Sequence, residues 1–242
     1  MNNDIYDVFR PYLTNMKENE IVFDEIFQQN NESNFPIKNI LELGIHVGEN
    51  PYFGGQSTKI FYFLFNKHGY DKLDSLDIYD GCIETIDIIK ELFNNFEKPN
   101  HNFIVSNSID YNTDQKYDLI FLDTNHDSGT TPSFGNENIV DGAGFTFLEI
   151  QKFSDMLTEN GRLILHDTKM FYQPVFLGSN VEGAIVKFIR ENNEWAFIEH
   201  NTNGCGLGEL IKKDCVLFDA LQEVDKYKNW QENSFLPIDS KY

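Results

Sequence analysis

The chain is predicted to fold as an α/β domain on a doubly wound, mostly parallel sheet that a C-terminal antiparallel hairpin completes. Three observations support this prediction. Apolar runs that suit buried strands alternate five times with segments of helical periodicity. Two of these runs, at 117–123 and 162–168, reach their end at an aspartate. The last two apolar runs, at 195–200 and 205–213, flank the turn sequence NTNG, which is typical of a hairpin.

The elements can be placed in order along the chain. Residues 1–36 are expected to form short helices, because apolar residues recur there at helical spacing. The domain is expected over residues 37–213, and residues 214–242 form a weakly patterned tail with one candidate helix. Ser57 or Thr58 could cap the helix that is expected over residues 59–69. Expected strands cover 37–44, 72–80, 102–108, 117–123 and 162–168, and expected helices cover 59–69, 85–96, 147–161 and 181–192. This order is typical of a Rossmann-like sheet.

The composition argues against several kinds of partner. The chain has 39 acidic and 19 basic residues, a formal net charge of -20. Binding to a nucleic-acid backbone relies on clusters of Lys and Arg, and the sequence shows none. No apolar run reaches the roughly 18 residues of a membrane span. We therefore expect a small-molecule partner, and neither a nucleic acid nor a membrane.

The cysteines and the amino terminus bear on the cellular compartment. Cys82, Cys205 and Cys215 are odd in number and form no Cys-x-x-Cys pair, which favours free thiols in a reducing environment. The first residues lack the basic and apolar regions of a secretory signal. A cytoplasmic protein is therefore expected. The N-terminal helices are a candidate surface for a homodimer.

A candidate site lies where the strands end. The sequence FLDTNHD places Asp123 at the end of the fourth strand and His126 just beyond it, and LILHDT places His166 and Asp167 at the end of the fifth. Open α/β sheets bind ligands in the crevice outside the carboxyl ends of their strands. The two aspartates are therefore expected to face one crevice.

The first two strands end in residues that suit a nucleoside ligand. Gly44, in LELGIHVG, allows a tight turn and a close approach to a ligand. Glu42 needs a partner if its strand is buried, either a cationic amine of a ligand or a group of the protein itself. Asp77, with Asp80 as the second candidate, could accept hydrogen bonds from ribose hydroxyls. The glycine-rich fingerprints of nicotinamide and triphosphate sites are absent from the sequence.

Together these motifs resemble those of class I S-adenosylmethionine-dependent methyltransferases. More narrowly, they are similar to the small-molecule O-methyltransferases that include cephalosporin-hydroxylase-like and sugar O-methyltransferase proteins. In that group a D-x-x-H after the fourth strand is followed by a helix and then by G-G-x-x-x-x-H-D-T. The similarity continues through VEGAIVKFIRENNEW and NGCGLGEL and covers residues 38–213.

The resemblance implies a role for each matching residue. Six residues would form the cofactor site for S-adenosylmethionine: Glu42, Gly44, Gly48, Asp77, Asn107 and Ser108. The first three would shape the methionine end, the fourth would hold the ribose, and the last two would lie near the adenine.

The resemblance also implies a catalytic centre. Asp123 and Asp167 match the acids that hold a divalent cation, such as Mg²⁺, in metal-dependent members. A hard cation takes oxygen ligands and lowers the pKa of a bound hydroxyl, and alignment of that oxygen with the methyl group supplies much of the rate. Either His126 or His166 would accept the proton, and His126, beyond the strand end, is the preferred base. In the alternative interpretations Asp123 caps a turn, His126 is an ordinary loop residue and His166 only orients its neighbours.

The sequence departs from the family pattern at His46, which replaces the usual middle glycine of the first turn, and at residues 127–146, which resemble an insertion. The expected function is O-methyl transfer to a hydroxyl of a small metabolite. A sugar or nucleotide-linked sugar in polysaccharide or natural-product biosynthesis is the leading acceptor. The alternatives are a metal-independent or N-methyltransferase, and a catalytically silent protein that keeps the fold for binding or assembly.

Overall fold

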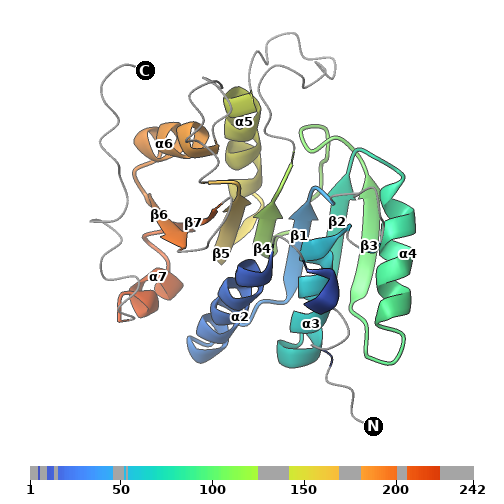
Figure 1. The fold of residues 1–242 in the computed structure, drawn as a ribbon. Coiled ribbons are helices and arrows are strands. Elements are labelled where there is room, and N and C mark those ends of the chain that lie inside the picture. The colour runs from blue at the N-terminus through green and yellow to red at the C-terminus, as the bar shows by residue number, and fades with distance from the viewer. Residues whose placement is uncertain are drawn as a thin grey trace.

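The described residues form one seven-stranded sheet with the strand order β3-β2-β1-β4-β5-β7-β6 (Figure 1). This computed structural model describes residues 5, 10–13, 16–45, 52, 54–124, 142–168, 181–200 and 206–223. The strands are β1 (Asn39–Leu43), β2 (Lys72–Asp77), β3 (Asn100–Val105), β4 (Tyr117–Leu122), β5 (Leu157–His166), β6 (Trp195–His200) and β7 (Leu207–Lys212). Strands β1 to β5 pair in parallel, and β7 runs antiparallel to both β5 and β6. The predicted fold class is confirmed.

Helices cover both faces of this sheet. They are η1 (Arg10–Tyr12), α2 (Lys17–Glu32), α3 (Gln56–His68), α4 (Cys82–Leu92), α5 (Gly142–Ser154), α6 (Val181–Glu191) and α7 (Val216–Leu221). Helices α2, α3 and α4 share one apolar core with the sheet, and α5 and α6 share another. Helix α7 packs against β6 and β7. Among the described residues, no helix is both long and apolar enough to cross a bilayer.

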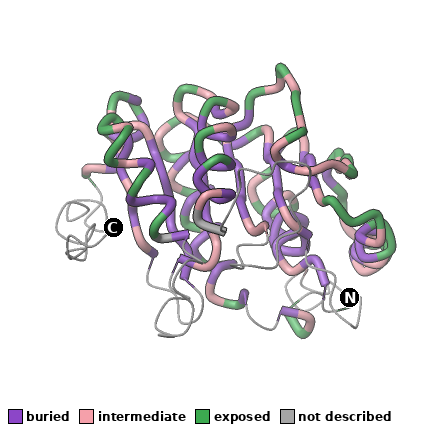
Figure 2. The backbone as a smooth tube through the Cα atoms, turned by 90° about the horizontal axis from the view of Figure 1, so that it is seen from above, coloured by how far each residue is buried: buried purple, intermediate pink, exposed green. Residues whose placement is uncertain are grey.

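Burial on both faces explains why the parallel strands read as continuous apolar runs. Successive side chains of a strand point to opposite faces of the sheet. Ile40 of β1 packs in the core beneath α2 and α3, and Leu41 packs in the core beneath α5 and α6. Neither side chain is exposed. Figure 2 shows the same arrangement from above, with buried segments inside and exposed stretches on the outer helices.

The structure corrects the predicted boundary between the last central helix and strand. A helix was predicted over 147–161, but α5 ends at Ser154 and β5 begins at Leu157. Gly161 therefore lies within a strand and does not end a helix. A Cβ atom on Gly161 would lie 3.0 Å from the carbonyl oxygen of Tyr117, so the glycine permits a close approach of β5 to β4.

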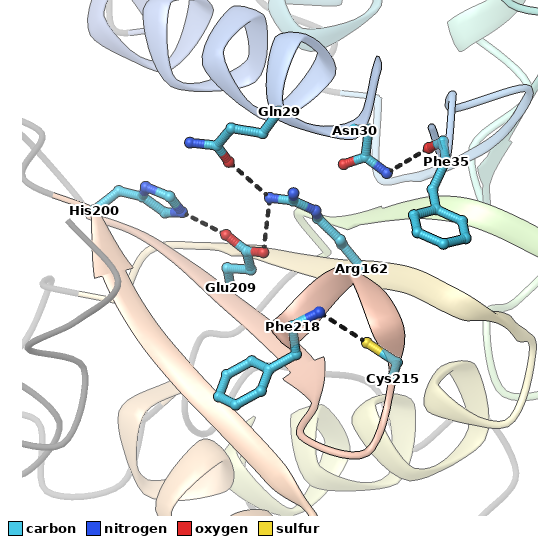
Figure 3. A network of polar contacts seen from close by, with 8 residues as sticks. All are labelled: Gln29, Asn30, Phe35, Arg162, His200, Glu209, Cys215 and Phe218. Atoms are coloured by element: carbon cyan, nitrogen blue, oxygen red, sulfur yellow. Dashed lines mark hydrogen bonds and ion pairs between the residues drawn. The ribbon is translucent and has the colours of Figure 1, made fainter. Parts of the chain in front are cut away.

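A buried polar network fixes the hairpin to the N-terminal helix (Figure 3). The Nη1 atom of Arg162 in β5 donates to Oε1 of Glu209 in β7 (3.0 Å) and to Oε1 of Gln29 in α2 (3.2 Å). The other carboxylate oxygen of Glu209 lies 3.0 Å from Nε2 of His200 in β6. Arg162, Glu209 and His200 are all fully buried. The network therefore joins α2 and β5 to the two strands of the hairpin.

The buried pair of Arg162 and Glu209 leads us to a prediction for the stability of the protein. We expect Arg162→Met to lower the free energy of unfolding by about 3–5 kcal/mol, because Glu209 would be left with a buried charge and one partner fewer. Urea denaturation followed by circular dichroism measures this loss. The double variant Arg162→Met/Glu209→Gln should lose less than the sum of the single variants. Additive losses would contradict a coupled pair.

Candidate functional site

The candidate site lies at the edge of the sheet where the parallel strands end. The carboxyl ends of β1, β2 and β4 point to the upper edge in Figure 1. Asp77 ends β2, Asp123 follows β4, and His166 and Asp167 end and follow β5. Because these strands are parallel, the predicted acids lie along one edge.

Asp123, His166 and Asp167 form a compact cluster. The Nδ1 atom of His166 lies 2.9 Å from Oδ1 of Asp123 and 3.1 Å from Oδ1 of Asp167. One potential ligand atom from each residue lies within 4.8 Å of the others. The side chains of Asp123, His166 and Asp167 are 16%, 13% and 22% exposed, so none of the three is fully buried. Asp167 also has a φ of 62°, a left-handed conformation that is costly for a non-glycine residue and is often found at functional sites.

The two carboxylates set the protonation of His166. Burial alone lowers the pKa of this imidazole, but the hydrogen bonds and charges of Asp123 and Asp167 outweigh burial and raise the pKa to about 10. His166 is therefore an imidazolium at neutral pH in the protein without a bound cation. An imidazolium cannot accept a proton, so in this state His166 orients the two carboxylates instead of serving as a base.

The first turn packs directly against the end of β4. Gly44 has a φ of 85°, and its amide donates to the carbonyl of Leu76 in β2 (3.0 Å). The amide of Asp123 donates to the carbonyl of Leu43 in β1 (2.9 Å). A Cβ atom on residue 44 would lie 2.1 Å from the carbonyl oxygen of Asp123, so only glycine fits this position.

Asp77 holds the same turn from the side of β2. Its Oδ2 atom accepts a hydrogen bond from the amide of Ile45 (2.7 Å), and its Oδ1 atom accepts one from the amide of Tyr79 (2.9 Å). Each carboxylate oxygen can accept a further bond. Asp77 is only partly buried, so it remains able to accept from a ribose. Its predicted contact with a ligand is therefore compatible with its structural role.

Glu42 finds its partners within the protein. It is fully buried, and its carboxylate accepts hydrogen bonds from Ser57 Oγ (2.5 Å), Thr58 Oγ1 (2.8 Å) and Ser75 Oγ (2.5 Å). Of the two alternatives for Glu42, the internal one therefore accounts for its burial. The expectation that Ser57 or Thr58 caps α3 is wrong: the cap position is Gly55, and both hydroxyls turn to Glu42.

This burial also alters the pKa of Glu42. Desolvation raises the pKa to about 7, and the charge of Asp123 adds to the effect, although the hydroxyl hydrogen bonds oppose it. Glu42 thus anchors the first turn of α3 beneath the predicted cofactor site. A direct contact between Glu42 and a cofactor stays a prediction.

The loop after β3 contains the two residues predicted near an adenine. Asn107 closes a turn, since its Oδ1 atom accepts from the amide of Ile109 (2.9 Å). Ser108 donates from Oγ to Oε1 of Glu149 in α5 (2.5 Å). The other oxygen of Glu149 accepts from Thr124 Oγ1 (2.6 Å). The structure thus adds Thr124 and Glu149 to the surroundings of the site.

Sequence reasoning missed Glu149, although a signal for it exists. Glu149 lies on the apolar stripe of α5 with Thr146, Ile150 and Phe153, all of them fully buried. A charged residue in such a stripe needs a polar partner. Burial raises the pKa of Glu149 to about 7, against the hydrogen bonds from its two hydroxyl partners and the charge of Lys152.

Several predicted residues lie outside the part of the chain that the structure describes. They are His126, the preferred base, Gly48, a predicted cofactor residue, and His46, the departure in the first turn. Their roles stay predictions.

Comparison with known proteins identifies the fold. No protein-family model and no curated protein sequence matches the chain. An O-methyltransferase from Bacillus cereus, solved with S-adenosylhomocysteine, matches with a TM-score of 0.56 and 12% identity over 88% of this chain and 92% of its own. A provisional caffeoyl-CoA O-methyltransferase from Staphylococcus aureus matches with a TM-score of 0.54 and 17% identity, over 87% and 93%. The N-methyltransferase NodS from Bradyrhizobium japonicum WM9 gives 0.50 and 13%, over 81% and 97%. The chain therefore has the fold of class I methyltransferases.

The close approach at the first turn can be tested with two alanine variants. Gly44→Ala should destabilise the protein and weaken ligand binding, because the new Cβ atom meets the carbonyl of Asp123. Gly69→Ala is a matched control, since Gly69 also has a positive φ (73°) but has no atom within 4 Å of its Cβ position. The control should lose only the conformational cost of a non-glycine residue at this backbone geometry (φ 73°, ψ 142°), about 1–3 kcal/mol. Equal losses in urea denaturation would refute the steric argument.

The two buried glutamates predict how stability depends on pH. In the folded protein both pKa values are raised from 4.5 to about 7. Between these values the folded state binds more protons than the unfolded state, so these groups make the free energy of unfolding fall as pH rises. We expect Glu42→Gln to remove part of this fall, measured by urea denaturation across the window. A pH dependence identical to that of the unmodified protein would contradict the assignment.

Proposed function

We propose that this protein is an S-adenosylmethionine-dependent O-methyltransferase that acts on a hydroxyl of a small metabolite. The observation that carries the proposal is the arrangement of acids at one edge of the sheet, with Asp77 beside the first turn and Asp123 and Asp167 around His166. The fold supports it, since matching folds include an O-methyltransferase solved with S-adenosylhomocysteine.

The cofactor would lie across the ends of β1, β2 and β3. In this proposal Asp77 binds the ribose hydroxyls, while the loop of Asn107 and Ser108 lies beside the adenine. Gly44 lets the turn after β1 approach the methionine end, and Glu42 holds the first turn of α3 in place. The roles agree with the hydrogen bonds described above, each of which fixes a backbone segment that the cofactor would contact.

The acidic cluster fits a divalent cation by its donor set. Two carboxylates and an imidazole place one atom each within 4.8 Å of one another and remain partly exposed. We propose that Asp123 and Asp167 hold the cation, with His166 as a neighbour that can contribute a nitrogen. A bound Mg²⁺ would lower the pKa of the acceptor hydroxyl and fix its position.

The reaction itself is a displacement at the methyl carbon. The acceptor oxygen forms a bond to this carbon as the carbon–sulfur bond breaks, and S-adenosylhomocysteine leaves as a neutral thioether. The hydroxyl proton passes to a general base, for which His126 is our candidate, because it follows the end of β4 in the sequence. The fixed strand ends supply the alignment that this step requires.

A sugar or nucleotide-linked sugar is the acceptor we propose, on the strength of the sequence resemblance. Transfer to a nitrogen is the second candidate, since the fold is shared with the N-methyltransferase NodS. A catalytically silent binding protein is the third, and His46 in the first turn favours it. A homodimer through the N-terminal helices stays a proposal.

Titration calorimetry with S-adenosylhomocysteine tests the proposal. We expect micromolar binding, and we expect Asp77→Ala to weaken it by roughly tenfold or more, because a hydrogen bond to a charged group contributes about 1.5–3 kcal/mol. Asp80→Ala is the matched control, since Asp80 is an exposed acid three residues away and should leave affinity unchanged. Equal effects of the two substitutions would contradict the assignment of the ribose to Asp77.

The same titration with Mg²⁺ separates the candidates. A magnesium-dependent change in heat that is lost in Asp123→Asn would support the cation site. Binding without turnover on any sugar would favour the silent protein. No binding under either condition would overturn the cofactor assignment itself.

A further inference from the structure

We infer that Glu149 is a positioning residue that joins the predicted adenine side of the site to the acceptor side. This inference rests on the proposed function, since it assigns the loop after β3 to the cofactor and the end of β4 to the acceptor. It concerns Glu149 of α5, which lies on neither loop and contacts both.

One carboxylate spans the two loops. The Oε1 atom of Glu149 accepts from Ser108 Oγ (2.5 Å), and the Oε2 atom accepts from Thr124 Oγ1 (2.6 Å). Ser108 is in the loop after β3, and Thr124 is two residues beyond the end of β4. Glu149 is fully buried and Ser108 is 6% exposed, so water competes little for the bond between them, while Thr124 is half-buried.

A second side chain of α5 holds the same loop. Lys152, three residues after Glu149, donates from Nζ to the carbonyl of Ile109 (2.5 Å). The amide of Ile109 is in turn held by Asn107. Glu149 and Lys152 thus lie on one face of α5, and together they fix the loop at two successive residues.

Thr124 connects this bridge to the acidic cluster. Thr124 directly follows Asp123. The amide of Asp123 donates a hydrogen bond to the carbonyl of Leu43, and its carboxylate is hydrogen-bonded to the imidazole of His166. A displacement of Thr124 would therefore be transmitted to Asp123 through one peptide unit. The contacts run without a break from Ser108 through Glu149 and Thr124 to the cluster.

Packing alone does not account for a glutamate at this position. A buried carboxylate has a high desolvation cost, and an apolar residue of similar volume is often equally stabilising or more so. A fully satisfied polar bridge instead fixes one arrangement of the groups that it joins. Catalytic groups need positioning to within about 0.5 Å, which such a bridge can provide. Cofactor affinity should therefore depend on Thr124, although Thr124 lies on the acceptor side.

A double-mutant cycle tests the bridge. We expect Thr124→Val to weaken binding of S-adenosylhomocysteine by about three- to tenfold, within the range of coupling energies for residues in one network. In a Glu149→Leu background the same substitution should have little further effect, and Glu149→Gln should restore part of the affinity. Thr158→Val is the matched control, and it should leave the affinity unchanged. The hydroxyl of Thr158 donates a hydrogen bond to Asp118 (3.0 Å) near the start of β5 and β4, at the edge of the sheet away from the site.

A measurement without ligand separates this inference from the proposed function. Amide hydrogen exchange over residues 106–111 should become faster in Thr124→Val than in the unmodified protein, and should stay unchanged in Thr158→Val. If the unmodified protein does not bind S-adenosylhomocysteine, the proposed function fails while exchange still decides the bridge. Additive losses in the cycle, or unchanged exchange over 106–111, would overturn the inference. If Glu149→Leu does not fold, Glu149→Gln takes its place in the cycle.

Discussion

The contact between the turn that follows β1 and the end of β4 is the constraint on which the rest of the site depends. Gly44 lies so close to the carbonyl of Asp123 that no Cβ atom can be accommodated. Backbone hydrogen bonds from both residues then tie β1 to β2 and to β4. Because the turn and the strand end cannot move independently, the position of the predicted cofactor loop and the position of the proposed catalytic residue Asp123 are set together.

Two buried carboxylates extend this constraint outward. Glu42 holds the first turn of α3 to β1 and β2, and Glu149 holds the loop after β3 to the end of β4. Both are bound by serine and threonine hydroxyls, and both have pKa values raised by burial. Neutral donors solvate a carboxylate less well than an ammonium or a guanidinium would. The molecule therefore fixes its loops at the cost of a carboxyl that is only partly ionised near neutral pH.

Local sequence patterns predicted most of the fold and the aspartates at the strand ends. A parallel strand needs apolar residues on both faces, so β1 and β4 could be recognised as apolar runs. Asp123 stood out where the run of β4 stops, and Asp77 stood out at the end of β2. The partners of Glu42 and Glu149 could not be found in this way, because they come from residues up to 41 positions away. The boundary between α5 and β5 was also predicted wrongly. A glycine such as Gly161 is typical of a helix end, but it is equally typical of a close contact between strands.

The electrostatics of the acidic cluster follow from the same geometry. The pairing of β4 with β5 places Asp123 and Asp167 directly after the ends of neighbouring strands, with the imidazole of His166 between them. Two carboxylates at this separation need positive charge nearby, and in the cation-free protein a proton on His166 supplies it. A divalent cation would satisfy the same demand with more charge. With two carboxylates and one imidazolium, the cluster keeps a net negative charge when no cation is bound. The sheet thus dictates the charge of the site as well as its shape.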